Sequence, residues 1–228
     1  MPLPVRRHTD VLRETTAFRG RRALEAGCGA GRLLAWLARE GAAPIGLDPD
    51  PAQLARARAE APAVPLVAGV GEALPFASGS LDLVLYFNSL HHVPLARQWQ
   101  ALVEAARVLA SGGELLVVEP LPEGDYFALL QPLEDETEAR REAFRALHAA
   151  GASGLRLVQE GCYDTRIAEP SWAATRARFL TANPARAEAL AQVEPELERL
   201  FASLGEPTPD GGRAFSQPMR FDLLRRLP

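Results

Sequence analysis

The chain has 228 residues, 47% of them hydrophobic and 24% charged, with a formal net charge of −4 at pH 7. A chain of this length is predicted to form a single α/β domain, residues 1–228, with a full core. The slight negative charge and the absence of any apolar run of about 18 residues argue against nucleic-acid binding and against a membrane span. The N-terminal residues include two arginines but no apolar h-region of a secretory signal, so we expect a cytoplasmic protein. We also expect a monomer or a homodimer.

The cysteine and lysine content of the chain excludes several kinds of site. Cys28 and Cys162 are the only cysteines, and they lack the spacing of a zinc site or of a disulfide framework, so we predict no metal. All 25 basic residues are arginine. Without lysine the chain has no P-loop lysine for a phosphate and cannot form a lysine Schiff base.

The chain begins with a predicted helix and a glycine-rich turn. Apolar residues at helical spacing predict an amphipathic helix over residues 8–18, within an N-terminal cap over residues 1–19. A strand over residues 22–25 then leads into Glu25-Ala26-Gly27-Cys28-Gly29-Ala30-Gly31. Because glycine has no Cβ, alternate glycines after a strand let a ligand lie against the backbone.

This turn does not fit the dinucleotide fingerprint Gly-x-Gly-x-x-Gly/Ala. With Gly27 and Gly29 as the first two glycines, the third place falls on Arg32, which is not small. Glu25 stands at the strand end instead. A carboxylate suits a cofactor that carries a sulfonium and an ammonium better than one that carries a pyrophosphate.

Two further strands follow the turn. The strand over residues 43–47 ends in Asp48, about 20 residues after the turn, where Rossmann-like sites hold a ribose hydroxyl. Asp50 is predicted to cap the next helix, which Pro51 opens. A third strand over residues 64–68 leads into Gly69-Val70-Gly71-Glu72-Ala73-Leu74-Pro75-Phe76.

The fourth strand is the most apolar. Residues 81–87 read as a buried parallel strand, and the polar run Asn88-Ser89-Leu90-His91-His92 follows it. Ligands of open α/β sheets bind beyond the carboxyl ends of the strands, so this run is expected beside the glycine turn. A helix, then Ser111-Gly112-Gly113, and a fifth strand over residues 114–118 complete the pattern.

Four motifs occur in this order over residues 20–120: the glycine-rich turn, the run 69–76, the polar run after the fourth strand, and the Gly-Gly turn before the fifth. They resemble those of the class I S-adenosylmethionine (SAM)-dependent methyltransferases of the type 11 kind. The resemblance implies SAM as the cofactor. The chain departs from the family at position 70. The family has an acid there that contacts the adenine amino group, whereas this chain has Val70, so the polar contact with adenine is in doubt. The residues implied to bind the cofactor are Glu25, Gly27, Cys28, Gly29, Gly31, Asp48, Pro49, Val70, Gly71, Glu72, Asn88, Ser89 and His91.

The family also supplies the expected fold. It is an α/β fold, a Rossmann-like doubly wound sheet of seven strands, mostly parallel with the last strand antiparallel, and helices on both faces. We expect a loop over residues 121–132, a helix over 134–149, and the last two strands over 155–163 and 217–224. Residues 171–213 between them are longer than a hairpin turn needs, and are interpreted as an inserted helical lid with helices over 172–181 and 185–204.

The expected reaction is methyl transfer to a small-molecule O, N or C acceptor. A base is needed only when the acceptor starts protonated, and His91 and His92 are the candidate catalytic residues, with Tyr163 and Asp164 as further candidates. The alternative for the two histidines, which the family resemblance favours, is that one shapes the pocket and the other packs or caps the helix. The acceptor is predicted to contact Tyr163, Trp172, Arg176 and Phe179, a set that favours an anionic or planar molecule. The alternative for Trp172 and Phe179 is that they anchor the lid.

Two other functions stay open on the sequence. A non-catalytic SAM-binding or regulatory protein would keep the glycine turn without an acceptor pocket, and Val70 gives it some support. An NAD-dependent oxidoreductase would also use Asp48, but Arg32 disrupts its fingerprint.

Overall fold

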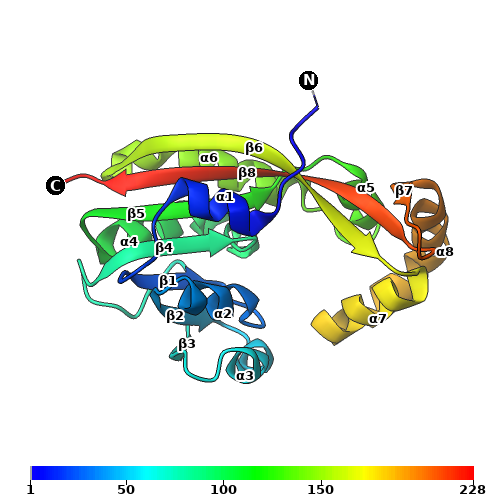
Figure 1. The fold of residues 1–228 in the computed structure, drawn as a ribbon, viewed down its shortest axis with the longest axis horizontal. Helices are drawn as coiled ribbons and strands as arrows, with labels where there is room; N and C mark the ends of the chain where they lie inside the picture. The colour runs from blue at the N-terminus through cyan, green and yellow to red at the C-terminus, as the bar shows by residue number, and fades with distance from the viewer. Residues whose placement is uncertain (1) are drawn as a thin grey trace. The chain divides into compact units, whose positions relative to one another are not determined.

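A computed structural model describes residues 2–228 and contains one mixed β-sheet with the strand order β3-β2-β1-β4-β5-β8-β6, to which β7 adds by pairing with β8 (Figure 1). In Figure 1 the arrow of β8 points opposite to that of β6. The strands are β1 (Arg22–Ala26), β2 (Ala43–Asp48), β3 (Leu66–Ala68), β4 (Leu81–Phe87), β5 (Leu109–Pro120), β6 (Leu155–Glu169), β7 (Glu206–Pro207) and β8 (Arg213–Arg226).

The helices are α1 (His8–Thr15), α2 (Arg32–Arg39), α3 (Pro51–Glu60), α4 (Gln98–Val108), α5 (Asp125–Leu130), α6 (Thr137–Ala149), α7 (Trp172–Ala182) and α8 (Ala187–Ser203), with short 3-10 turns η1 (Leu90–His92), η2 (Leu95–Arg97), η3 (Ala150–Ser153) and η4 (Pro184–Arg186). The Rossmann-like mixed sheet and the helical insertion between its last two long strands confirm the fold expected from the sequence.

The chain divides into two compact units. The larger, which we call the sheet unit, comprises residues 8–119, 139–161 and 220–228. The smaller, the helical unit, comprises residues 1–7, 120–138 and 162–219. The strands β6 and β8 each supply residues to both units.

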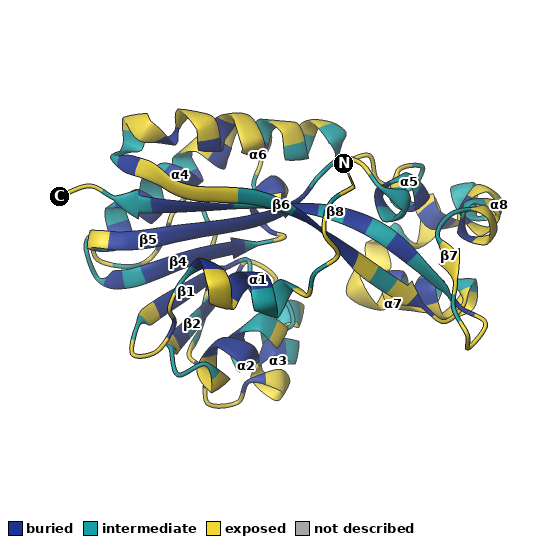
Figure 2. Ribbon diagram, turned by 45° about the horizontal axis from the view of Figure 1, so that its top comes forward, coloured by how far each residue is buried: buried dark blue, intermediate teal, exposed yellow. Residues whose placement is uncertain are grey.

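The sheet unit holds the main hydrophobic core. The pairs β1–β2, β1–β4, β2–β3 and β4–β5 are all parallel. Apolar residues of α4 and α6 join residues of β1, β4 and β5 in one core cluster, and Figure 2 shows the buried strands as dark blue between helices with exposed outer faces. Continuous apolar strands such as β4 form here because helices cover the parallel sheet.

Several boundaries predicted from the sequence were wrong. The first helix ends at Thr15 instead of residue 18, and the third strand begins at Leu66 instead of residue 64. The helix expected over 134–149 begins at Thr137, and the last long strand spans Arg213–Arg226 instead of 217–224. The fifth strand begins at Leu109, because Leu81 pairs with Leu109 before a register shift and Leu83 pairs with Glu114 after it, so residues 110–113 form an irregular section of the strand. The sixth strand continues to Glu169 instead of ending at 163.

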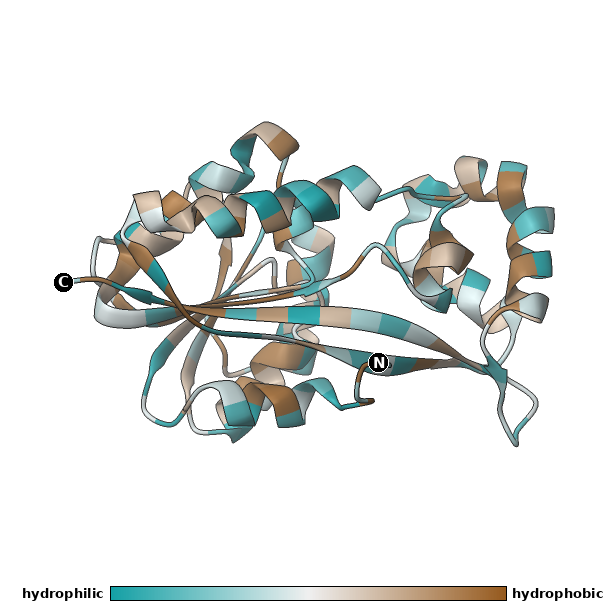
Figure 3. Ribbon diagram, turned by 90° about the horizontal axis from the view of Figure 1, so that it is seen from above, coloured by the Kyte–Doolittle hydropathy of each residue, from teal (hydrophilic) through white to brown (hydrophobic). Residues whose placement is uncertain are grey.

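The helical unit has its own apolar core. Phe201 of α8 packs against Trp172 of α7 and Phe215 of β8, with ring centroids 6.1 and 5.3 Å apart. Residues 121–132, expected to be a loop, contain the helix α5, and its Leu129 is completely buried in this cluster. Figure 3 shows hydrophobic and hydrophilic residues mixed along these helices. In α8 the buried residues Leu190, Leu197 and Phe201 recur at helical spacing and so lie on one face.

No helix within the described part of the chain is both long and apolar enough to cross a membrane.

Candidate cofactor-binding site

The glycine turn joins β1 to α2, and each of its three glycines has a positive φ: 77° at Gly27, 51° at Gly29 and 81° at Gly31. At Gly27 an added Cβ would lie 2.5 Å from Ser89 Cβ, and at Gly31 one would lie 2.9 Å from Ala57. At Gly29 a Cβ would meet no described atom within 4 Å. Packing therefore requires Gly27 and Gly31, whereas Gly29 borders open space.

The turn is tied to the end of β2. The N–H groups of Gly27 and Cys28 donate to the carbonyl oxygen of Leu47 at 2.8 and 3.0 Å. Burial, and then the nearby carboxyls of Glu25 and Asp48, raise the pKa of the Cys28 thiol to about 12. This thiol is protonated at neutral pH and acts as a small packing group.

Asp48, at the end of β2, is mostly buried with 7% exposure. Its Oδ2 accepts the N–H of Gly29 at 2.8 Å, and its Oδ1 accepts the N–H of Asp50 at 2.9 Å. Each carboxylate oxygen keeps a second lone pair for another donor. Asp48 thus both shapes the turn and can hold hydroxyl groups, while Asp50 caps α3 through Ala52 N–H and Pro49 lies exposed between them.

Glu25, at the end of β1, is a buried acid in need of a partner. It is 3% exposed, and its Oε2 has no hydrogen-bond partner within residues 2–228. Burial, and then the charge of Asp48, raise its pKa well above the usual range. A buried unpaired carboxyl beside a second acid fits a cationic ligand, since both acids gain from a positive charge nearby.

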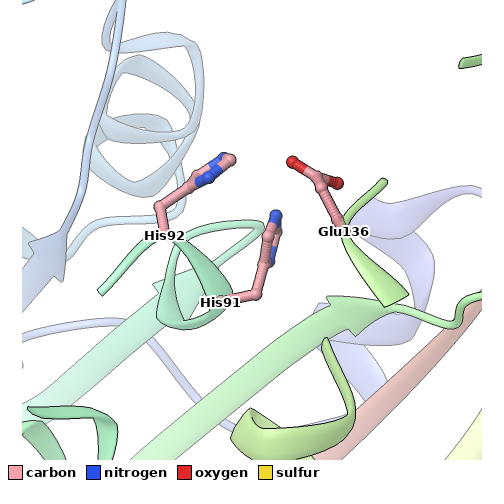
Figure 4. Close-up of side chains that lie close together, drawn as sticks. All are labelled: His91, His92 and Glu136. Carbon is pink, nitrogen blue, oxygen red and sulfur yellow. The ribbon is translucent and has the colours of Figure 1, made fainter. Parts of the chain in front are cut away.

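The segment after β4 is built around Asn88, whose φ of 53° makes it the one non-glycine residue among 2–228 with a positive φ. Asparagine tolerates this conformation better than most residues. Ser89 Oγ donates to the carbonyl oxygen of Ala26 at 2.7 Å and so joins this segment to the glycine turn. His91 and His92 follow on η1, with their ring centroids 4.1 Å apart and both side chains on the same side of the turn (Figure 4).

Glu119, at the end of β5, holds this segment in place. Its Oε1 accepts the N–H groups of Ser89 and Leu90, each at 2.9 Å, and its Oε2 accepts the N–H of His91 at 3.3 Å and contacts His91 Nδ1. Burial alone would raise the pKa of Glu119, but His91 and the two N–H groups outweigh it and lower the pKa.

Sequence reasoning missed Glu119. The available signal was an acid at the carboxyl end of an apolar strand, the position already assigned to Glu25 and Asp48. His8 is another neighbour of this edge: its ring packs on Phe87 at the end of β4, 5.0 Å between centroids, and burial lowers its pKa.

The segment after β3 places Val70 at the surface, 37% exposed and bridged to Ala73, with Glu72 half-buried. Tyr86 Oη donates to the carbonyl oxygen of Gly71 at 3.2 Å, and an added Cβ at Gly71 would lie 2.9 Å from that hydroxyl. The close approach of Tyr86 explains why this position is a glycine.

A pair on α4 fixes the end of the same segment. Glu104 accepts the N–H of Leu74 at 2.9 Å, and Arg107 donates to the carbonyl oxygens of Leu74 and Phe76 at 2.9 and 2.8 Å. The pair is itself joined at 2.7 Å. The arginine at this position therefore orders the Leu-Pro-Phe turn.

The acceptor candidates all belong to the helical unit. Phe179 is 4% exposed in a cluster with Leu190 and Leu197, and Trp172 packs against Phe201. These two side chains have the anchoring contacts that the sequence left open as the alternative, and their contact with an acceptor stays a prediction.

Arg176 and Tyr163 also have partners within the helical unit. Arg176 Nε lies 2.6 Å from Glu194 Oε1 of α8. Tyr163 is buried, and burial raises its pKa far above the usual range against the smaller effect of Arg6. Tyr163 therefore keeps its proton at neutral pH, which weakens the prediction that it acts as a base.

The sheet unit resembles known proteins in sequence. Residues 24–117 match the family model of a methyltransferase domain. The chain is 36% identical over 100 residues to an uncharacterized methyltransferase of Synechocystis sp., covering 44% of this chain and 47% of that protein. It is 42% identical over 120 residues to a Mycolicibacterium smegmatis protein assigned as a SAM-dependent methyltransferase, covering 50% and 44%.

Residues 24–117 contain a methyltransferase domain, which is similar to those of SAM-dependent methyltransferases. A crystal structure of a candidate methyltransferase from Bacillus halodurans C-125 superposes with a TM-score of 0.66 at 18% identity, covering 96% of this chain and 98% of that one, which supports the fold alone. SAM is the cofactor of this family. The chain spans less than half the length of the two sequence relatives.

Proposed function

We propose that this methyltransferase moves the methyl group of SAM to a small-molecule acceptor. The observation that carries the proposal is the group at the ends of β1 and β2: Gly29 borders open space and donates its N–H to the buried Asp48, whose charge also acts on the buried, unpaired Glu25. Asp48 would hold the ribose hydroxyls and Glu25 the cationic amino acid part, while SAM supplies an activated methyl group.

Placement does most of the work in this reaction. The methyl group leaves a sulfonium, the leaving group departs neutral, and no general acid is required. The backbone of the glycine turn and of the Asn88–Ser89 segment would position the cofactor. These segments are already fixed by Leu47, Asp48 and Glu119, so little ordering would remain to be done on binding.

A protonated acceptor would also need a base, and His91 suits this role better than His92. The carboxylate of Glu119 contacts His91 Nδ1, so it orients the ring and stabilises its charged form, and Nε2 would take the proton. The burial of His91 supports a fixed ring, whereas His92 is exposed.

The experiment is calorimetry with SAM and with its demethylated product, followed by a screen for transfer of a labelled methyl group to anionic and planar small molecules. The wild-type chain should bind both cofactor forms in the micromolar range. Asp48→Asn should weaken them by about 1.5–3 kcal/mol, the size of a lost charged hydrogen bond.

Asp50→Asn is the matched control, because Asp50 caps α3 two residues later and an asparagine side chain keeps that cap. It should leave SAM affinity unchanged. Equal affinity in the Asp48 variant and in the wild type would refute the ribose assignment, and tight binding of NAD with none of SAM would refute the proposed function.

A further inference from the structure

The strand β6 lies at the end of the strand order and so forms one edge of the sheet. Its five residues 156–160, all in the sheet unit, are exposed, including Leu157 at 45% and Val158 at 41%. Figure 2 shows this stretch of β6 in yellow along the margin of the sheet. An edge that offers apolar side chains and unpaired backbone groups is an open site for another strand.

Farther along β6, within the helical unit, the N-terminal segment already covers the edge. Arg6 N–H donates to the carbonyl oxygen of Asp164 at 2.8 Å, and Asp164 N–H donates to that of Pro4 at 2.9 Å. This coverage does not extend to residues 156–160, where the edge carries no proline. The open part is therefore short and sharply bounded.

The sequence of this open part is complementary to itself. In Arg156-Leu157-Val158-Gln159-Glu160 the two ends have opposite charges and Val158 is the centre. When two such strands pair antiparallel about a two-fold axis at Val158, Arg156 of each copy lies opposite Glu160 of the other. Val158 then faces its own copy, and Leu157 faces Gln159.

The charged groups are available for this pairing. The Arg156 guanidinium has no ion-pair partner among residues 2–228 of its own chain. Glu160 contacts Arg220 through Oε2, its side chain is 50% exposed, and its second oxygen can accept from another arginine.

The surface beside the edge is also apolar. A groove of about 360 Å³ borders β6 and α6, lined in part by Leu147, Leu155, Leu157, Leu224 and Leu227. Leu227 is 44% exposed. The groove extends the contact area beyond the strand pair, which is needed because a single pair of strands is marginally stable in water.

We propose that the occupant of this edge is a second copy of the chain, and that two chains join their sheets through antiparallel pairing of residues 156–160. The self-complementary charges select this occupant and this register over others. The inference is independent of the reaction that the enzyme catalyses.

Charge exchange between two variants tests the register. The full wild-type chain should be dimeric by sedimentation equilibrium, and Arg156→Glu should raise the dimer dissociation constant by more than about tenfold because like charges then meet at both ends. Glu160→Arg alone should do the same. An equimolar mixture of the two variants restores opposite charges at both ends, so it should dimerise nearly as well as the wild type.

The mixture also removes a local complication. Glu160→Arg places an arginine beside Arg220, but this repulsion is identical in the variant alone and in the mixture. Arg58→Glu, an exposed charge reversal on α3, is the control and should leave dimerisation unchanged. Amide hydrogen exchange of residues 156–160 should slow as wild-type concentration rises.

Three results would overturn the inference. A wild-type chain that stays monomeric at high concentration excludes self-pairing and leaves the edge to another partner. A dimer that resists Arg156→Glu, or variants whose mixture fails to dimerise, excludes this register. Exchange at residues 156–160 that is independent of concentration places the contact elsewhere.

Discussion

Replacing Glu119 with glutamine removes the charge that holds the Asn88–His92 segment. The carboxylate accepts three backbone N–H groups and contacts His91 Nδ1 in a buried position. If the glutamine oxygen keeps the bonds to Ser89 and Leu90, its NH₂ group faces the N–H of His91, so two donors meet. One unsatisfied N–H, together with the loss of charge from the remaining bonds, amounts to about 2–4 kcal/mol.

This loss should be visible both in stability and at the site. The free energy of unfolding in urea should fall by about 2–4 kcal/mol, and the SAM dissociation constant should rise at least about tenfold, since 1.4 kcal/mol of the loss within the site is enough for that factor. Calorimetry with SAM measures the second quantity on the folded variant.

Glu114→Gln is the matched control for Glu119→Gln. Glu114 lies earlier in the same strand with the same 8% exposure, and it accepts from Thr16, Arg21 and Arg225. Its variant should lose stability while SAM affinity stays within about twofold. Unchanged SAM affinity in Glu119→Gln, or an equal loss in both variants, would refute the argument that Glu119 positions the cofactor segment.

The stability of the fold at acidic pH should also depend on the charge of Glu119. The pKa of Glu119 is lower in the folded chain than in the unfolded one, so its contribution is complete above the unfolded pKa of about 4.5 and is lost as pH falls through the folded pKa. Glu119→Gln should therefore lose less stability than the wild type on acidification. A parallel acid profile would contradict the assigned role of the charge.

Three other predictions concern the two units. Gly29→Val and Gly79→Val both place a side chain in open space at a positive φ, 51° and 69° respectively, so each variant should lose about 1–2 kcal/mol of stability. Only Gly29→Val should abolish SAM binding in calorimetry. If this variant still binds SAM, Gly29 does not line the site. Because the pKa of Glu25 is raised in the folded chain, the wild type should lose stability relative to Glu25→Gln as pH rises above about 4.5. SAM binding should release a proton from the wild type but not from Glu25→Gln, which calorimetry in buffers of different ionisation enthalpy measures. Equal proton release in the two proteins would mean that Glu25 does not face the cofactor's cation. Replacing residues 171–213 with a short Gly-Ser turn should leave SAM affinity within a few fold and remove methyl transfer, and full activity would show that the segment is not a lid.

The sequence by itself determined the features that depend on local pattern. Hydrophobic periodicity placed the first four strands within two residues of their observed bounds, because it reflects burial directly, whereas the Rossmann-like sheet was implied by the resemblance to the family. The spacing from the glycine turn to Asp48 predicted which strand ends meet, because parallel strands place their carboxyl ends at one edge. The helices within residues 171–213 were also predictable, with boundaries shifted by one or two residues.

Only the tertiary structure decided which of these residues act together. Glu119 is 28 residues from His91 in the chain, and no local pattern indicates that its carboxylate organises the segment after β4. The separate roles of Gly27 and Gly29 depend on Ser89, which lies about 60 residues away in the sequence and beside only one of them. Such contacts arise when neighbouring strands in the sheet come from distant parts of the chain. The sequence therefore identified the elements of the site, and packing determined what each of them holds.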